Sequence, residues 1–178
     1  MAYTHSTANL GLLPIANTDP GVTFPNASSA SPTPPNKLGM VVHANDPTYG
    51  DGEFILLAGV ANTAVGSLVT YNTSSYTTAL AAVGANKPQP IAVAMSANTS
   101  ASTWGWYQIS GMAVMKKTCT VSLAANAAVG VLTTGLVAGS GSGKEIQGAL
   151  VAAVASATAG RTTVQVVINR PHMQGRIT

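Results

Sequence analysis

From residue 38 onward the chain is a series of short apolar runs separated by Gly, Asn, Ser and Thr. About nine such runs follow one another at a spacing of roughly 8–12 residues, which is typical of an all-β sandwich or barrel. The strongest of them covers residues 162–169, because β-branched side chains dominate it. Pro171 is expected to end this strand. The sequence therefore predicts an all-β fold, either a compact β-sandwich or a small β-barrel.

Two features qualify this pattern of strands. Gly111 interrupts one long apolar run and predicts a bend or bulge there. Alanine accumulates at 77–83 and 149–157, where either a strand or a short helical turn fits the composition. The expected strands are 39–43, 52–58, 65–71, 90–96, 104–110 continuing into 112–115, 118–123, 129–133, 146–154 and 162–169.

The first 36 residues differ from the rest and predict an extended, Pro-rich N-terminal arm in front of a β domain at 37–178. Proline fixes φ and keeps the preceding residue extended, so a helix is not expected at about 14–36. A disordered leader is the alternative, but the segment has little charge and spaced apolar residues, which favours an arm laid along a neighbouring subunit. The prolines are Pro14, Pro20, Pro25, Pro32, Pro34 and Pro35. The expected apolar contacts are Leu10, Leu13, Ile15, Val22 and Phe24.

Charge is scarce in this chain. It has eight Lys and Arg and five Asp and Glu among 178 residues, whereas about a quarter of an ordinary domain is charged. A nearly neutral surface tends to associate, and an Ala-rich core buries little apolar area per side chain. Both points predict a self-associating subunit of an assembly. The net charge of +3 does not predict nucleic-acid binding, because Lys116-Lys117 is the only adjacent basic pair.

The motifs of common catalytic and metal sites are incomplete. The three histidines have no metal-ligand spacing, and Cys119 stands alone. The segment 139–144 resembles a phosphate loop, but Ala138 and Glu145 stand where Gly and Ser or Thr are required. We therefore expect no enzyme, no cofactor and no metal. The sequence also shows no secretory signal and no membrane span, which predicts synthesis in a cytosol.

The densest aromatic group is Trp104, Trp106 and Tyr107. Alternate residues of a strand share a face, so the two indoles are expected on one side and the phenol on the other. The group could supply bulk to a core of small side chains, and we favour this for at least one Trp. It could also form an interface hot spot or a platform for stacking sugars.

The run from Gly105 to Val114, Gly-Trp-Tyr-Gln-Ile-Ser-Gly-Met-Ala-Val, resembles a strand of capsid decoration (cement) proteins of tailed phages. The preceding Pro90-Ile-Ala-Val-Ala resembles their "Ile-Gly-Val-Ala" strand, and 124–133, Ile146-Gln-Gly-Ala-Leu and the final Val-Val-Ile-Asn-Arg-Pro follow in the same order. The resemblance covers about residues 52–171. It is one of order and composition, and the Pro-rich arm lies outside it.

The resemblance implies a compact β fold that binds the outer surface of an icosahedral phage capsid and stabilises contacts between capsomers, often as a homotrimer. The expected partners are the major capsid protein and other copies of the chain, with no nucleic acid and no membrane. The expected location is the capsid surface of the virion, after synthesis in the host cytoplasm. Alternatives are another virion subunit, such as a head-fibre base or a tail-associated protein, a carbohydrate-binding β-sandwich that uses Trp104 and Trp106, and a hydrolase.

Overall fold

The computed structural model describes residues 3–6, 12–22, 32–34, 36–84, 86–118, 120–158, 160 and 162–175. Within these residues the protein is all-β, with twelve strands in one sheet and no helix. All named strand pairs are antiparallel, and the path β1-β3-β4-β8-β12-β11-β9-β10 has two ends, so the sheet is not closed. The prediction of an all-β fold is confirmed, and the arrangement is that of a β-sandwich-like protein.

The strands are β1 (Thr4–His5), β2 (Thr18–Asp19), β3 (Val41–Asp46), β4 (Gly50–Ala58), β5 (Leu68–Tyr71), β6 (Thr78–Leu80), β7 (Ile91–Ala94), β8 (Trp104–Lys116), β9 (Ala128–Thr133), β10 (Leu136–Gly139), β11 (Glu145–Val151) and β12 (Thr163–Met173).

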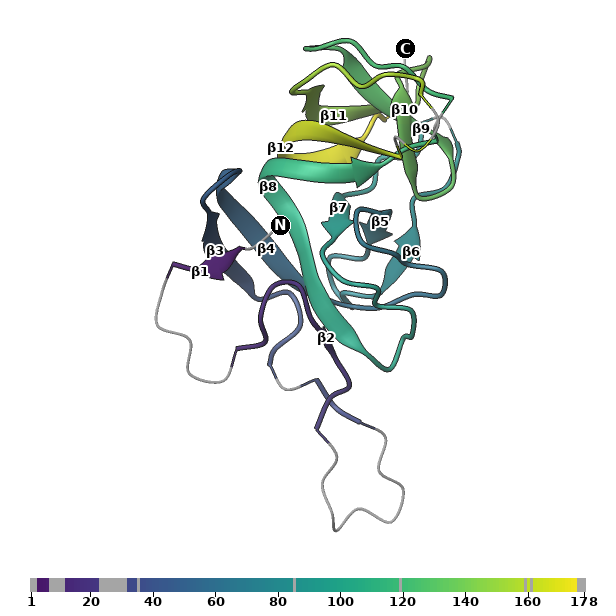
Figure 1. Cartoon of the computed structure of the whole chain (residues 1–178). Helices are drawn as coiled ribbons and strands as arrows, with labels where there is room; N and C mark the ends of the chain where they lie inside the picture. Colours follow the sequence, from purple (N-terminus) through teal and green to yellow (C-terminus); the bar gives the residue numbers. More distant parts are fainter. Residues whose placement is uncertain are drawn as a thin grey trace.

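Strand β8 connects all parts of the sheet. Its first half pairs with β4, and β2 and β7 also pair with this half, whereas its second half pairs with β12. Figure 1 shows β8 bending between a lower half beside β4 and an upper half beside β12. The apolar run at 104–115 is therefore one strand that belongs to two parts of the fold.

A bulge marks the junction between the two halves of β8. Phe54 pairs with Gln108 and Glu53 pairs with Ser110, so Ile109 is the extra residue on β8. The buried amide of Gln108 donates to the carbonyl oxygens of Ser110 and Met112 at 3.1 Å each. These bonds replace ladder bonds that the bulge interrupts.

Gly111 follows the bulge with φ +98°, as the predicted bend requires. A Cβ atom at this position would lie 2.4 Å from the carbonyl oxygen of Asp51.

The apolar interior falls into three clusters. The first lies between the β5–β7 pair and the sheet of β9, β11, β12 and the second half of β8. The second contains Trp104 and Trp106 with residues of β3, β4 and the arm. The third contains Tyr107 and Ile109 with residues of β4, β5 and β7. Trp104 and Trp106 thus share one face of β8 and Tyr107 lies on the other, as predicted.

The described part of the arm packs on the β domain of its own chain. Ile15 is 1% exposed and Tyr3 is 7% exposed, and both lie in the cluster of the two tryptophans. The indole Nε1 of Trp106 donates to the carbonyl oxygen of Leu13 at 2.8 Å. Strand β1 pairs with β3, and β2 pairs with β8. The predicted boundary between an arm at 1–36 and a domain at 37–178 therefore separates residues that pack in one apolar cluster.

Several predicted strands need correction. Pro171 does not end the last strand, because β12 continues to Met173. Asn169, Arg170 and Pro171 of β12 lie opposite the single residue Gly148 of β11, so Pro171, which has no N–H, belongs to a bulge of β12 itself. Residues 118–123 form no strand among the described positions and contribute one isolated bridge, at Leu123. The alanine-rich segments form β6 and the end of β11. Strands β1, β2 and β10 were not predicted.

A buried asparagine fixes the loop between β7 and β8. We assign the Asn98 amide with its nitrogen toward Thr103, where it donates to the hydroxyl and the carbonyl oxygen of that residue. Its oxygen then accepts from the N–H groups of Gly59 and Gly105 at 3.1 and 3.2 Å and from the Tyr107 hydroxyl at 3.2 Å. Burial raises the pKa of Tyr107 to about 12, and its hydrogen bonds with Asn98 and Thr78 partly oppose this effect.

Gly111→Ala should destabilise the protein strongly, because the new Cβ atom would meet the Asp51 carbonyl oxygen at 2.4 Å. Gly50→Ala is the matched control, since Gly50 also has a positive φ of +74° but nothing within 4 Å of the position that a Cβ atom would take. Urea denaturation should give a free energy of unfolding at least about 2 kcal/mol lower for Gly111→Ala than for Gly50→Ala. Equal losses would show that only the backbone conformation matters.

Ile15→Ala tests whether the arm shares the core of its own chain. We expect a loss of about 2–4 kcal/mol in the free energy of unfolding, because a buried side chain is replaced by a cavity. Val22→Ala, in the same arm but 45% exposed, should change stability by less than about 0.5 kcal/mol. Similar small effects at both positions would contradict the packing of the arm.

The buried Tyr107 predicts a loss of stability at high pH. Its pKa is about 12 in the folded protein and about 10 in an unfolded chain, so between these values the unfolded state binds fewer protons. The free energy of unfolding should then fall by about 1.4 kcal/mol per pH unit from this residue alone. Tyr107→Phe should show a shallower slope between pH 10 and 12 in chemical denaturation. Parallel slopes for the two proteins would refute this assignment.

Candidate functional site

The second half of β8, β12 and β11 present one largely uncovered side-chain face. Directly paired residues of antiparallel strands lie on the same side of a sheet. The pairs Met112–Val167 and Val167–Leu150 form one rung across three strands, and Val114–Gln165 and Lys116–Thr163 form the next two rungs along β8. We call this surface the open face; it consists of Ser110, Met112, Val114, Lys116, Leu150, Thr163, Gln165, Val167 and Asn169.

The centre of the open face is apolar. Leu150 is 50% exposed and Val167 is 47% exposed, although they pair directly with each other. Met112 and Val114 on β8 are half-buried. A hollow of about 380 Å³ lies over this part of β11 and β12 and is lined by both exposed side chains, together with Glu145 and Asn169. Exposed apolar rungs on adjacent strands are typical of a contact surface.

A charged cluster borders the open face at its Ser110 end. It consists of His43, Asp51, Glu53 and Arg170; the first three line a hollow of about 180 Å³ together with Ser110. The Arg170 guanidinium donates to Glu53 Oε2 at 2.8 Å, and Asn45 Nδ2 donates to Asp51 at 2.9 Å. His43 Nε2 lies 4.0 Å from Glu53 Oε1. Because the Arg170 side chain is 65% exposed and the Glu53 side chain keeps some contact with solvent, the ion pair adds about 1 kcal/mol or less to stability.

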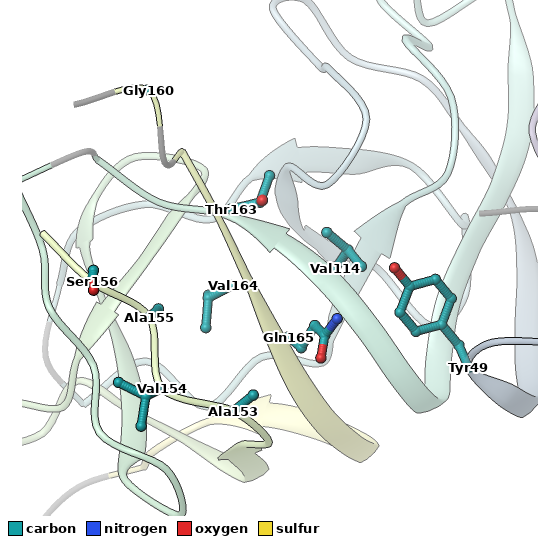
Figure 2. A pocket seen from close by; sticks show the side chains of 10 residues that line it. All are labelled: Tyr49, Val114, Ala153, Val154, Ala155, Ser156, Gly160, Thr163, Val164 and Gln165. Carbon is teal, nitrogen blue, oxygen red and sulfur yellow. The ribbon is translucent and has the colours of Figure 1, made fainter. Parts of the chain in front are cut away.

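A second hollow, of about 390 Å³, includes the Lys116 end of the open face, because Val114, Thr163 and Gln165 line it together with Tyr49, as Figure 2 shows. Its polar lining groups are the hydroxyls of Tyr49, Ser156 and Thr163 and the amide of Gln165. Val154, which is 68% exposed, stands at its rim. None of the described side chains that line it is Asp, Glu, His, Lys or Arg, and the hollow offers hydroxyl and amide groups for hydrogen bonds as well as apolar contact.

Among the described residues, no group of three or more His, Cys, Asp or Glu side chains could hold a metal ion. The described part of the chain also holds no helix with the length and apolarity that crossing a membrane would need. Cys119 lies outside the described residues.

The residues predicted for an interface lie in different environments. Trp106 is fully buried, and Trp104 and Ile15 are 5% and 1% exposed, so contacts within the chain already cover them. Leu13 is half-buried and Val22 is 45% exposed. Leu10 and Phe24 lie outside the described residues. A neighbouring subunit could reach Leu13 and Val22 directly, whereas the other three described side chains would become accessible only if the arm moved away.

The open face itself was not predicted, although the sequence has one signal for it. In β12, Val164, Val166 and Ile168 alternate toward the core, and a strand with a solvated outer face would carry polar residues between them. Gln165 and Asn169 fit this rule, but Val167 does not. The break in alternation marks the exposed apolar rung. Nothing comparable in the sequence indicates that Glu53 and Arg170 meet.

No protein-family model, curated protein or solved structure matches this chain.

Proposed function

We propose that the chain is a structural protein of a tailed-phage virion that binds the outer surface of the icosahedral capsid and stabilises contacts between capsomers. The observation that carries this proposal is the character of the surface, which combines few charges with exposed apolar side chains on separate parts of the molecule. Val41 on β3 is 38% exposed, and Leu132 on β9 is 48% exposed, in addition to the open face. Figure 1 shows β3 and β9 far apart in the molecule.

Apolar contacts in several directions suit a lattice subunit. A decoration subunit that lies across a seam between capsomers adds contact area to the closed shell and therefore stabilises it by mass action. Repetition on a symmetric lattice turns modest individual contacts into strong retention. The resemblance of residues 105–114 to a decoration-protein strand supports the same function, with the major capsid protein and further copies of the chain as partners and the capsid surface as the location.

The proposed role is structural and needs no catalytic centre. The described side chains that line the hollow of Figure 2 include no Asp, Glu, His, Lys or Arg. A sugar-binding platform of Trp104 and Trp106 is not proposed, because both indoles are covered within the chain and stacking needs an exposed ring face.

Reconstitution tests the proposal. Heads of the encoding phage would be prepared from a strain in which this gene is deleted, and purified protein would be added at increasing concentration. We expect saturable co-sedimentation with the heads in a sucrose gradient, and release of packaged DNA at a higher temperature than from undecorated heads. An equal amount of an unrelated basic β protein serves as control. Absence of binding at concentrations of about 10 µM, far above the working range of specific complexes, would refute the proposal.

A further inference from the structure

The open face carries opposite charges at its two ends. At the Ser110 end lie the carboxylates of Asp51 and Glu53, of which Glu53 is paired with Arg170. At the other end, six residues along β8, Lys116 pairs with Thr163. Leaving His43 aside, the two carboxylates and one guanidinium give the first end a net charge of one minus, Glu145 adds a carboxylate at the hollow over β11 and β12, and Lys116 gives the other end one positive charge. The rungs between the two ends are apolar or uncharged.

This arrangement is complementary to itself. Consider a two-fold axis that lies in the plane of contact, runs at right angles to β8 and passes over Ala113. It would place Lys116 of one copy opposite Ser110 of the other. The Met112 rung would then lie over the Val114 rung. Ser110 pairs with Glu53, and paired strands are about 4.8 Å apart. The Lys116 ammonium would therefore reach the carboxylates of Asp51 and Glu53, and the symmetry repeats this contact once.

We infer that the partner of the open face is a second copy of this chain, bound through a two-fold contact that joins the apolar rungs and pairs Lys116 with the Asp51 and Glu53 carboxylates. The inference concerns the protein alone and does not depend on capsid binding. It also differs from the trimer that the resemblance implies, because a two-fold contact between the same surface on two copies gives a dimer.

The size of the face sets the strength of the contact. Three strands about 4.8 Å apart and six residues at about 3.3 Å each cover roughly 300 Å² per copy, less than half of the ~800 Å² of a standard interface. The pair should therefore be reversible, with monomer at low concentration and dimer at high concentration.

Sedimentation velocity over a concentration series of roughly 5–500 µM tests the inference. Wild-type protein should shift from monomer to dimer, and raised salt should weaken the dimer because exposed charges are screened. Lys116→Glu should weaken dimerisation at least about tenfold, and Asp51→Lys should do the same. The double variant Lys116→Glu with Asp51→Lys should regain dimerisation, because it restores opposite charges across the contact.

Two further variants distinguish a specific role of the open face from a general effect of changed charge or stability. Lys87→Glu makes the same change of charge in an exposed loop outside the open face and should leave dimerisation unchanged. Val167→Thr keeps a β-branched residue in β12 and should weaken the dimer. Circular dichroism and thermal melting would show that each variant is folded. A monomer at all concentrations, a trimer, or a dimer that neither charge reversal at Lys116 nor Val167→Thr weakens would overturn the inference, and failure of the swapped pair to recover would refute the charge contact.

Discussion

The fold depends on one strand, β8, whose first half pairs with strands on both edges and is covered on both faces. Every part of the sheet reaches β8 either directly or through neighbouring strands, and β4 and β12 take the two halves in turn. This is possible because the bulge at Ile109 and the positive φ of Gly111 turn the strand without ending it. The buried Gln108 amide supplies the hydrogen bonds that the turn removes from the ladder.

Much of the strand arrangement could be predicted from the sequence, because the alternation of apolar residues and the positions of glycine are local properties of the chain. The strands around 52–58, 104–115 and 163–169, the special role of Gly111 and the opposite faces of Trp106 and Tyr107 all followed from alternation and from glycine. The errors arose where a partner elsewhere in the chain decides the structure. Pro171 is tolerated within β12 because it belongs to a bulge of that strand opposite Gly148 of β11, and the short strand β1 forms because it pairs with β3.

The open face was harder to predict for a related reason. A residue is exposed or buried according to which other segments pack on it, and the local sequence does not determine which strands those segments reach. The arm was expected to contact a neighbour because its apolar residues have no core of their own. Its described part completes the core around Trp106, and contact of the arm with a neighbour stays a prediction. Conversely, Val167 has the sequence context of a core residue in a β-branched strand and is 47% exposed. The ion pair of Glu53 with Arg170 joins residues 117 apart in the sequence.

The position of the open face follows from the same strand that organises the fold. On the side of β8 that carries Tyr107 and Ile109, residues of β4, β5 and β7 cover the first half of the strand. Beyond the bulge this cover becomes partial, because Met112 and Val114 are half-buried, and the apolar residues extend through Val167 to Leu150, which are about half exposed. On this side of β8, the first and second halves are both apolar and differ mainly in how many other strands pack on them. In a chain with only 13 charged residues, an uncovered apolar half has few charges to keep it solvated, and covering it with a second protein surface removes that apolar area from water.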